Sequence, residues 1–394
     1  MNRSLLLIGG ALLTWGIGEG MFLLFVPLYL QELGADPLAI GSILGLFGFM
    51  MMIVHIPAGY LADRFGRKPL LVISWGIGVG AAWLMAVSRT LPLFVIGYLV
   101  YGLTAFVSSP LFSYVAAARG SLSVGRAMTI TSALFNAGAV AGPISGGWIG
   151  DHLGLRSTFL VAACVLLVSM ATILFLSPQP RDDHDEVSRQ GHLRSNLPYV
   201  RLLGALFVAS FAMYLPQPLT PNFLQNERQI SLEFMGWIGS AGSVGNVAFN
   251  LVLGRGSPRL GFLLGQAAVG FFAVLIWKGA GIASYALGYF LLGGFRAARV
   301  LGFAQVRSLV HQAQMGLAFG VTESVNAFAM ILAPLAAGSL YARDPASIYP
   351  IALLCLAAAV LLYRSWSPRD APAGSALSHS MSGERAADAG ENGA

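Results

Sequence analysis

The sequence predicts an all-α membrane protein in which twelve transmembrane helices form two pseudo-symmetric six-helix bundles. The prediction rests on the composition, the length of the apolar runs and a repeat between the two halves of the chain. The 394 residues are 56% hydrophobic and 10% charged, whereas soluble domains carry roughly 25% charged residues. A soluble fold could not bury so much apolar surface, so lipid must surround most of the chain. In lipid, only helices and closed barrels satisfy every backbone hydrogen bond.

The apolar runs have the length of membrane-spanning helices. Crossing the hydrocarbon core takes roughly 20 apolar residues, and the alternating pattern of barrel strands is missing from these runs. The first run contains Glu19 and is longer than the core of a signal peptide, so we expect it to be retained. Twelve spans are predicted, at 5–30, 38–61, 70–88, 93–117, 126–149, 157–176, 200–224, 233–253, 260–277, 283–306, 316–341 and 347–363.

Lys and Arg are distributed unevenly between the two sides of these spans. With the N-terminus in the cytoplasm, 16 of the 23 Lys and Arg residues fall inside and five outside, while Arg296 and Arg299 lie within a span. The positive-inside rule therefore predicts a multi-pass protein of the cell membrane with both termini in the cytoplasm. The same rule explains the net charge of +6 without a nucleic-acid partner.

The chain divides into two similar halves. The predicted domains are a first bundle at 1–176, a polar cytoplasmic linker at 177–199, a second bundle at 200–366 and a disordered tail at 367–394. The halves repeat at a spacing of 191 residues, so two six-helix bundles related by an axis along the membrane normal are expected. The repeat pairs Tyr98 with Tyr289, Gly102 with Gly293, Thr131 with Thr322, Pro143 with Pro334, Gly147 with Gly338 and Cys164 with Cys355.

A charged loop between the second and third spans indicates the family. Its sequence, GYLADRFGRK at 59–68, resembles the loop between helices 2 and 3 of the major facilitator superfamily, a family of secondary transporters. The resemblance covers about residues 5 to 365. It implies a substrate site at the midplane between the halves and alternating access, with the loop helping to control the conformational switch. The loop residues to which this role carries over are Gly59, Asp63, Arg64, Gly66, Arg67 and Lys68; anchoring of the topology alone is the simpler interpretation.

A glycine-rich motif in the fifth span predicts close helix packing. Small residues four apart let two helix backbones touch, and a proline within a helix removes a hydrogen bond. The pattern resembles a motif of the drug and proton antiporter branch of the superfamily, which favours export over uptake. Its residues are Gly138, Gly142, Pro143, Gly146 and Gly147. The arginine that many proton antiporters carry four residues before a span-four glycine is replaced here by Tyr98, so the proton-transfer role of that arginine does not carry over to this chain.

Ionisable residues within the spans mark the chemistry, because a charge in the bilayer is costly and is usually functional. Glu19 lies near the middle of the first span, and Arg296 and Arg299 share one face of the tenth. If the packing of the family holds, these side chains face one space from opposite halves. Glu323 in the eleventh span could take part or could pair with an arginine of a neighbouring helix, and His55 is expected to be interfacial.

Several interpretations of this set stay open. Glu19 could pair with an arginine as a gate, it could carry a proton, or the arginines could bind a carboxylate or phosphate group. The charges could also neutralise one another in a purely structural cluster. Aromatic and polar side chains at a similar depth are candidate substrate contacts, namely Tyr98, Tyr101, Tyr214 and Gln217.

The predicted function is secondary transport by alternating access. Proton-coupled export of a small amphipathic compound is favoured, with Glu19 as the proton-binding residue; the alternative is uptake or exchange of an organic anion bound by Arg296 and Arg299. The chain has no nucleotide-binding loop or metal-ligand motif, so we expect neither an enzyme nor a cofactor or metal. The expected partners are a small-molecule substrate, the proton and the lipid bilayer, and the resemblance implies a monomer.

Overall fold

The computed structural model describes residues 3–65, 67–177, 196–311 and 314–367, without the side chains of 55–65, 109 and 316. The described residues are helical almost throughout, which confirms the predicted all-α class. The first half contains α1 (Arg3–Leu23), α2 (Val26–Glu32), α3 (Pro37–Phe65), α4 (Arg67–Val87), α5 (Leu91–Gly102), the 3-10 helix η1 (Leu103–Val107), α6 (Ser108–Ala117), α7 (Val124–Leu153) and α8 (Leu155–Leu174). The second half contains α9 (Leu197–Tyr214), α10 (Thr220–Asn226), α11 (Leu232–Leu253), α12 (Pro258–Lys278), α13 (Ile282–Leu309), α14 (Met315–Arg343), η4 (Pro345–Ser347) and α15 (Ile348–Trp366).

These helices follow the twelve predicted spans. Nine of the described helices are long and apolar enough to cross a membrane, or ten if the bent pair 91–107 and 110–117 forms one span. The two remaining predicted spans correspond to α11 and α13. The small and polar residues of α11 and the three arginines of α13 lower their hydropathy, although both helices are long enough to cross.

Three predicted spans are broken where the sequence predicted one continuous helix. The first breaks between α1 and α2, where Pro27 lies in the first turn of α2 and its ring cannot continue the preceding helix. The seventh breaks between α9 and α10 in a segment that contains Pro216 and Pro218, and Pro221 begins the next turn. The fourth tightens into η1 between α5 and α6. Proline therefore places matching breaks in the first helix of each half.

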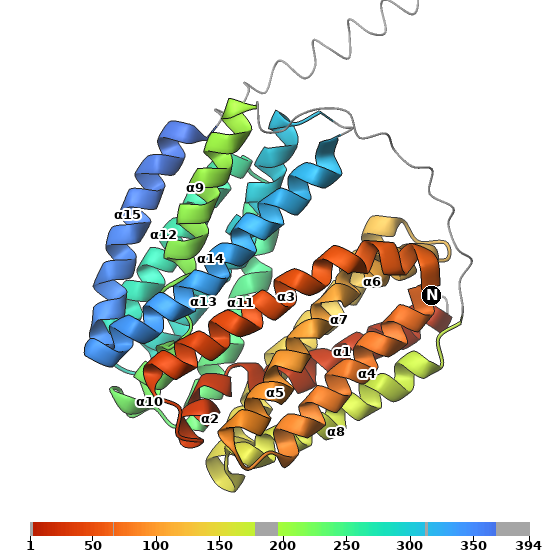
Figure 1. The fold of residues 1–394 in the computed structure, drawn as a ribbon, viewed down its shortest axis with the longest axis horizontal. Coiled ribbons are helices and arrows are strands. Elements are labelled where there is room, and N and C mark those ends of the chain that lie inside the picture. The colour runs from red at the N-terminus through yellow and green to blue at the C-terminus, as the bar shows by residue number, and fades with distance from the viewer. Residues whose placement is uncertain (1–2, 66, 178–195, 312–313, 368–394) are drawn as a thin grey trace, which may run out of the picture.

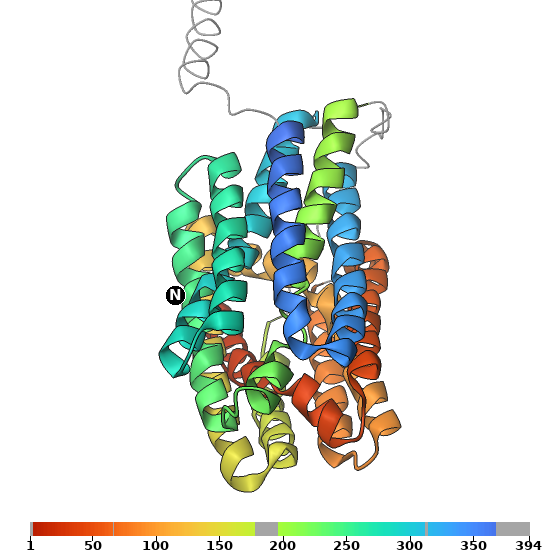
Figure 2. The ribbon, with the colours of Figure 1, turned by 90° about the vertical axis from the view of Figure 1, so that its left-hand side faces the viewer.

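The helices form two groups that follow the two halves of the chain. Figures 1 and 2 show α1 to α8 as one bundle and α9 to α15 as a second bundle beside it. Within the first bundle, α1 packs on α7 and α8; within the second, α13 packs on α11 and α12. Helix α9 begins at Leu197, so the helix starts before residue 199, the predicted C-terminal end of the linker 177–199. Residues 178–195 of the linker and 368–394 of the tail lie outside the described residues.

The two bundles meet along two helix pairs that match each other in the repeat. Helix α7 contacts α11, and α14 contacts α3. In the first pair, a Cβ on Gly147 would lie 3.0 Å from the Cα of Gly236; in the second, a Cβ on Gly338 would lie 3.2 Å from the Cα of Gly41. Only glycine allows backbones to approach so closely. The repeat partners Gly147 and Gly338 therefore occupy equivalent contacts between the halves.

Short helices α2 and α10 close the same end of the molecule. The side-chain amide of Asn222 donates to the Gln31 Oε1 at 2.6 Å and to the Pro27 carbonyl at 3.1 Å. Asn226 also donates to the Gln31 Oε1, at 3.0 Å, and to the hydroxyl of Tyr341 at 3.3 Å. Figure 1 shows α3 and α14 meeting near α2 and α10 and diverging away from them. We call this closed region the α2/α10 end.

Candidate functional site

Glu19 lies in the middle of α1 and is held by a neighbour one turn earlier. The indole Nε1 of Trp15 donates a hydrogen bond of 2.9 Å to the Glu19 Oε2. Residues four apart share one face of a helix, so this contact follows from their spacing. A hydrogen bond to an ionised carboxylate is among the stronger ones in proteins. Glu19 is partly buried, and the bond from Trp15 orients its carboxylate.

Trp15 is itself fixed by aromatic neighbours. Its ring stacks on Tyr101 with centroids 6.1 Å apart and lies 5.0 Å from the ring of Trp75. The Trp75 Nε1 donates to the Ser169 Oγ at 2.8 Å, and that hydroxyl donates to the backbone carbonyl of Ala11 at 2.6 Å. A Cβ on Gly78 would collide with the Trp15 ring, so the glycine leaves the space that the indole needs. The support of Glu19 thus extends through α4 and α8.

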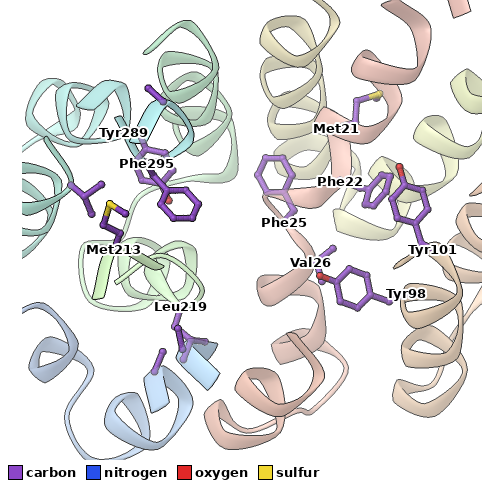
Figure 3. Packing of buried hydrophobic residues seen from close by; sticks show 14 of the residues in the cluster. Met21, Phe22, Phe25, Val26, Tyr98, Tyr101, Met213, Leu219, Tyr289 and Phe295 are labelled. Atoms are coloured by element: carbon purple, nitrogen blue, oxygen red, sulfur yellow. The ribbon is translucent and has the colours of Figure 1, made fainter. Parts of the chain in front are cut away.

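The two tyrosines of α5 line the same region of the first bundle. Tyr98 stacks on Phe47 with centroids 4.2 Å apart, and Tyr101 meets Phe22 edge-on at 5.1 Å. Both tyrosines are buried, and the hydroxyl of Tyr101 has no hydrogen-bond partner among the described residues. Figure 3 shows both rings on the side of the first bundle, beside Phe22 and Val26, with Phe295 of the second bundle on the opposite side. They form an apolar wall with polar hydroxyls.

Arg296 faces this wall from α13 of the second bundle. Its charge attracts that of Glu19 across the interface, although no ion pair within 4.0 Å joins them in the described part of the chain. The arginine also interacts electrostatically with Tyr214 of α9. Its side chain is exposed despite its position in the middle of a spanning helix. A charge in the middle of a spanning helix is costly and usually marks a functional position.

Arg299 is engaged differently from Arg296. It forms an ion pair with Glu323 of α14, and both side chains are 34% exposed. The Arg299 Nη1 also lies 3.9 Å from the Met330 sulfur. The structure therefore pairs Glu323 with an arginine of the neighbouring helix, which is one of the two interpretations that the sequence left open. This pairing leaves Arg296 without an ion-pair partner within 4.0 Å among the described residues.

Tyr214 and Gln217 lie where α9 ends. Tyr214 stacks on Phe295 of α13, with ring centroids 5.8 Å apart. It also interacts electrostatically with Tyr98 across the interface between the two bundles. Gln217 uses its amide to donate to the carbonyl of Met213 at 2.7 Å. That carbonyl belongs to the last turn of α9, where backbone acceptors lack partners in the helix. The structure thus brings Tyr214 into the shared region and gives Gln217 a capping contact.

The glycine-rich motif of α7 joins α1 and so supports Glu19 from behind. A Cβ on Gly142 would lie 2.5 Å from the Ile17 carbonyl and 2.7 Å from the Cα of Gly20. Both contact residues flank Glu19 in the sequence. The other motif glycines make similarly close backbone contacts: Gly138 and Gly146 with α1, and Gly147 with α11, whereas Pro143 lies inside α7 beside Gly20 and Gly236.

The loop residues predicted to act in switching are described only in part. Arg67 and Lys68 begin α4. Gly59, Asp63 and Arg64 fall within the last turns of α3. Gly66 and the side chains of Asp63, Arg64 and His55 lie outside the described residues.

Sequence reasoning missed the role of the amide cluster at the α2/α10 end. Gln31, Asn222 and Asn226 carry no charge and no motif, and 191 residues separate Gln31 from Asn222. The repeat could have indicated this contact, because it aligns the segment around Gln31 with the segment around Gln225. The Trp15–Glu19 contact could have been found from the spacing of four residues.

A sequence model of the Major Facilitator Superfamily matches residues 8–201 and 202–387, one match for each half. The chain belongs to the major facilitator superfamily. It is therefore a multi-pass membrane transporter rather than an enzyme, which confirms both predictions.

Relatives with assigned names support the branch of the superfamily. The chain is 27% identical over 307 residues to the class C tetracycline resistance protein of Escherichia coli, covering 74% of each chain. It is 25% identical to the class B protein of the same organism, covering 84% of this chain and 88% of that one. It is also 26% identical to multidrug resistance protein 1 of Bacillus subtilis over 176 residues, 44% of this chain and 45% of that one. This major facilitator protein is thus a secondary transporter related to tetracycline and multidrug resistance proteins.

Solved structures agree with the fold. A point mutant of the nucleoside transporter NupG matches with a TM-score of 0.81 and 15% identity, over 92% of this chain and 100% of that one. A mutant of the peptide transporter POT matches with a TM-score of 0.74 and 14% identity, over 93% and 95%. At these identities the likeness extends to the fold alone, which confirms the predicted arrangement of two helical bundles.

Proposed function

We propose that this transporter exports a small amphipathic compound in exchange for protons, and that Glu19 carries the proton. The observation that supports this most is the position of Glu19. It is a carboxylate in the middle of a spanning helix, set in an aromatic wall and facing a cationic side chain of the opposite bundle. Ionisable groups in such places are costly and usually serve transport or proton transfer.

The charges suggest how a proton could be coupled to movement of the bundles. When Glu19 is ionised, it attracts Arg296 and favours arrangements that hold α1 near α13. Protonation removes that attraction, so the equilibrium between conformations shifts by the differential interaction energy. A proton bound on one side and released on the other would then drive the substrate in the opposite direction. Glu19 therefore needs access to water from each side in turn.

The surroundings of Glu19 fit an amphipathic substrate. Trp15, Tyr98 and Tyr101 form a packed aromatic wall beside Glu19, and Tyr214 adds a partly buried ring from the second bundle. Aromatic surfaces of this kind bind small molecules through apolar area and gain orientation from a few polar groups. The relatives are named for resistance to tetracycline and to multiple drugs, which supports a compound of this class.

We propose that the α2/α10 end faces outward, as the distribution of Lys and Arg predicts. On that orientation, both termini are cytoplasmic and the described conformation is closed on the outside. The 59–68 loop would then act on the cytoplasmic side in the conformational switch, and the protein would work as a monomer in the cell membrane.

The second candidate is transport of an organic anion. Arg296 supports it, because this side chain is exposed and lies in no ion pair within 4.0 Å in the described part of the chain. A guanidinium group suits carboxylate and phosphate groups. Arg299 contributes less to this candidate than the sequence indicated, since Glu323 already neutralises it.

A ligand panel separates the two candidates. Binding to the folded state raises the apparent unfolding temperature, so purified protein is heated with lipophilic cations, neutral drugs and organic anions. The export proposal predicts stabilisation by cations or neutral drugs in the wild type and in Arg296→Gln alike. Stabilisation by anions alone, lost in Arg296→Gln but kept in Arg307→Gln, would favour the organic-anion candidate. Arg307 is the matched control because it lies near the end of the same helix.

A further inference from the structure

Three metal-ligating side chains meet at the α2/α10 end, away from the substrate site. Asp151 and His152 lie in the last turn of α7, and Glu233 lies in the first turn of α11. One ligand atom from each residue lies within 4.8 Å of the other two. The set combines a ring nitrogen with two carboxylates, and its members come from opposite halves of the chain.

The imidazole of His152 is oriented by a contact of the kind that supports metal ligands. Its Nδ1 lies 2.9 Å from the carbonyl of Trp148, and its ring stacks on the indole of that residue at 4.8 Å. A carbonyl can only accept a hydrogen bond, so Nδ1 carries the proton in this contact. The lone pair is then on Nε2. A metal-bound histidine commonly donates its other ring N–H to a backbone carbonyl, which fixes the tautomer.

The two carboxylates place like charges together across the interface. Asp151 accepts a hydrogen bond of 3.2 Å from the backbone N–H of Leu232, which orients it towards the start of α11. Glu233 is in that same turn. Among the described residues, neither carboxylate has a Lys or Arg partner within 4.0 Å. Closure of this end therefore brings two negative groups together, and a bound cation would remove their repulsion.

We propose that Asp151, His152 and Glu233 form a site for a divalent transition metal such as Zn²⁺. One nitrogen and two oxygen donors match zinc, which binds His and carboxylate ligands, whereas Ca²⁺ and Mg²⁺ prefer all-oxygen sets. Because the ligands come from both bundles, the site is complete only when α7 and α11 are in contact. The metal therefore stabilises the conformation that is closed at the α2/α10 end.

This site has a consequence for transport. Opening of the α2/α10 end would move Glu233 away from Asp151 and His152, so the open conformation would bind the metal more weakly. A ligand shifts a conformational equilibrium by its difference in affinity for the two states. Zinc on that side of the membrane would then slow the transport cycle whatever the substrate is. The proposal depends on the contact between the bundles and not on Glu19.

Thermal unfolding of the full-length protein with ZnCl₂ tests the site. The variants are His152→Ala and Glu233→Gln, with His311→Ala as control because His311 is an exposed histidine distant in sequence. We expect a saturable rise in unfolding temperature in the wild type and in His311→Ala, reversed by EDTA, and at least tenfold weaker binding in the other two variants. MgCl₂ should give no rise. No zinc effect, or an equal effect in all four proteins, would overturn the proposal.

A measurement in chelator guards against misfolding of the variants. In EDTA, Glu233→Gln should unfold close to the temperature of the wild type, because relief of the repulsion between the two like charges offsets the lost interaction of an acid with the N-terminus of α11. A markedly lower unfolding temperature would mean that the protein itself neutralises the carboxylate, and this would contradict the proposal. In proteoliposomes, external ZnCl₂ should slow substrate exchange by the wild type and leave exchange by His152→Ala unchanged.

Discussion

The indole of Trp15 donates a hydrogen bond of 2.9 Å to the carboxylate of Glu19, one helical turn away. The bond fixes where the proposed proton carrier points. Trp15 in turn rests on Trp75 and Tyr101, and Gly78 leaves space for its ring. The position of one carboxylate at the interface therefore depends on three helices of the first bundle.

Trp15→Phe should weaken coupling, because the change keeps an aromatic ring but removes the N–H donor to Glu19 and the part of the indole that fills the space beside Gly78. A hydrogen bond to a charged group contributes about 1.5–3 kcal/mol, so we expect transport driven by a pH gradient to fall about tenfold. The measurement is the initial rate in proteoliposomes. Trp366→Phe is the control, since Trp366 is 41% exposed at the end of the last helix. An unchanged rate in Trp15→Phe would remove the positioning role.

Arg299 and Glu323 should show a modest coupling energy. The pair is 34% exposed, so water screens it and we expect about 1 kcal/mol in a double-mutant cycle. Arg299→Gln and Glu323→Gln should each destabilise the protein, and the double variant should be more stable than the sum of the two changes predicts. Chemical unfolding in detergent measures all four proteins. Strict additivity would show that the two charges do not interact.

Gly142→Ala should separate α1 from α7. A Cβ there would lie 2.5 Å from the Ile17 carbonyl, so the helices must move apart at a cost of about 1–3 kcal/mol. Gly10→Ala is the matched control, because a Cβ on Gly10 meets nothing within 4 Å. That control should stabilise α1 by about 0.5–1 kcal/mol through its better helix propensity. Equal unfolding free energies for the two variants would contradict the packing account.

Gln31→Ala should loosen the α2/α10 end. The change removes the acceptor for Asn222 and Asn226 and leaves the Asn222 amide, buried at 1% exposure, with one bond fewer. A lost partner for a buried polar group costs about 1–3 kcal/mol, so hydrogen exchange of the α2 and α10 amides should quicken about tenfold. Asn136→Ala is the control, since the bonds of Asn136 stay within its own helix. Unaltered exchange in α2 and α10 would show that the amide cluster does not hold this end closed.

Much of the fold was predictable because lipid imposes strong constraints on sequence. Apolar runs of the required length and the repeat at 191 residues predicted the helices and their division into two bundles. The breaks after α1 and α9 were missed, although Pro27 and Pro216 were visible, because proline is tolerated in spanning helices where neighbours satisfy the freed backbone groups.

The site was less predictable, because its contacts depend on how the bundles meet. The positions of Glu19 and Arg296 within their spans placed both residues at a similar depth in the membrane. The sequence did not show whether Arg296 or Arg299 forms an ion pair. The Arg299–Glu323 pair depends on the rotation of α13 against α14. The bond between Gln31 and Asn222 exists only because the α2/α10 end is closed. A transporter sequence must support several conformations, so it does not specify which end of the molecule is closed.

The central claim, that Glu19 couples export to protons, is tested most directly by Glu19→Gln in proteoliposomes. Two rates are measured with a compound from the ligand panel: transport driven by an imposed pH gradient, and exchange of labelled for unlabelled compound without a gradient. We predict that Glu19→Gln loses gradient-driven transport and keeps exchange. The control Glu32→Gln, at an exposed acid that ends α2, should keep both. Gradient-driven transport by Glu19→Gln at the wild-type rate would contradict the central claim.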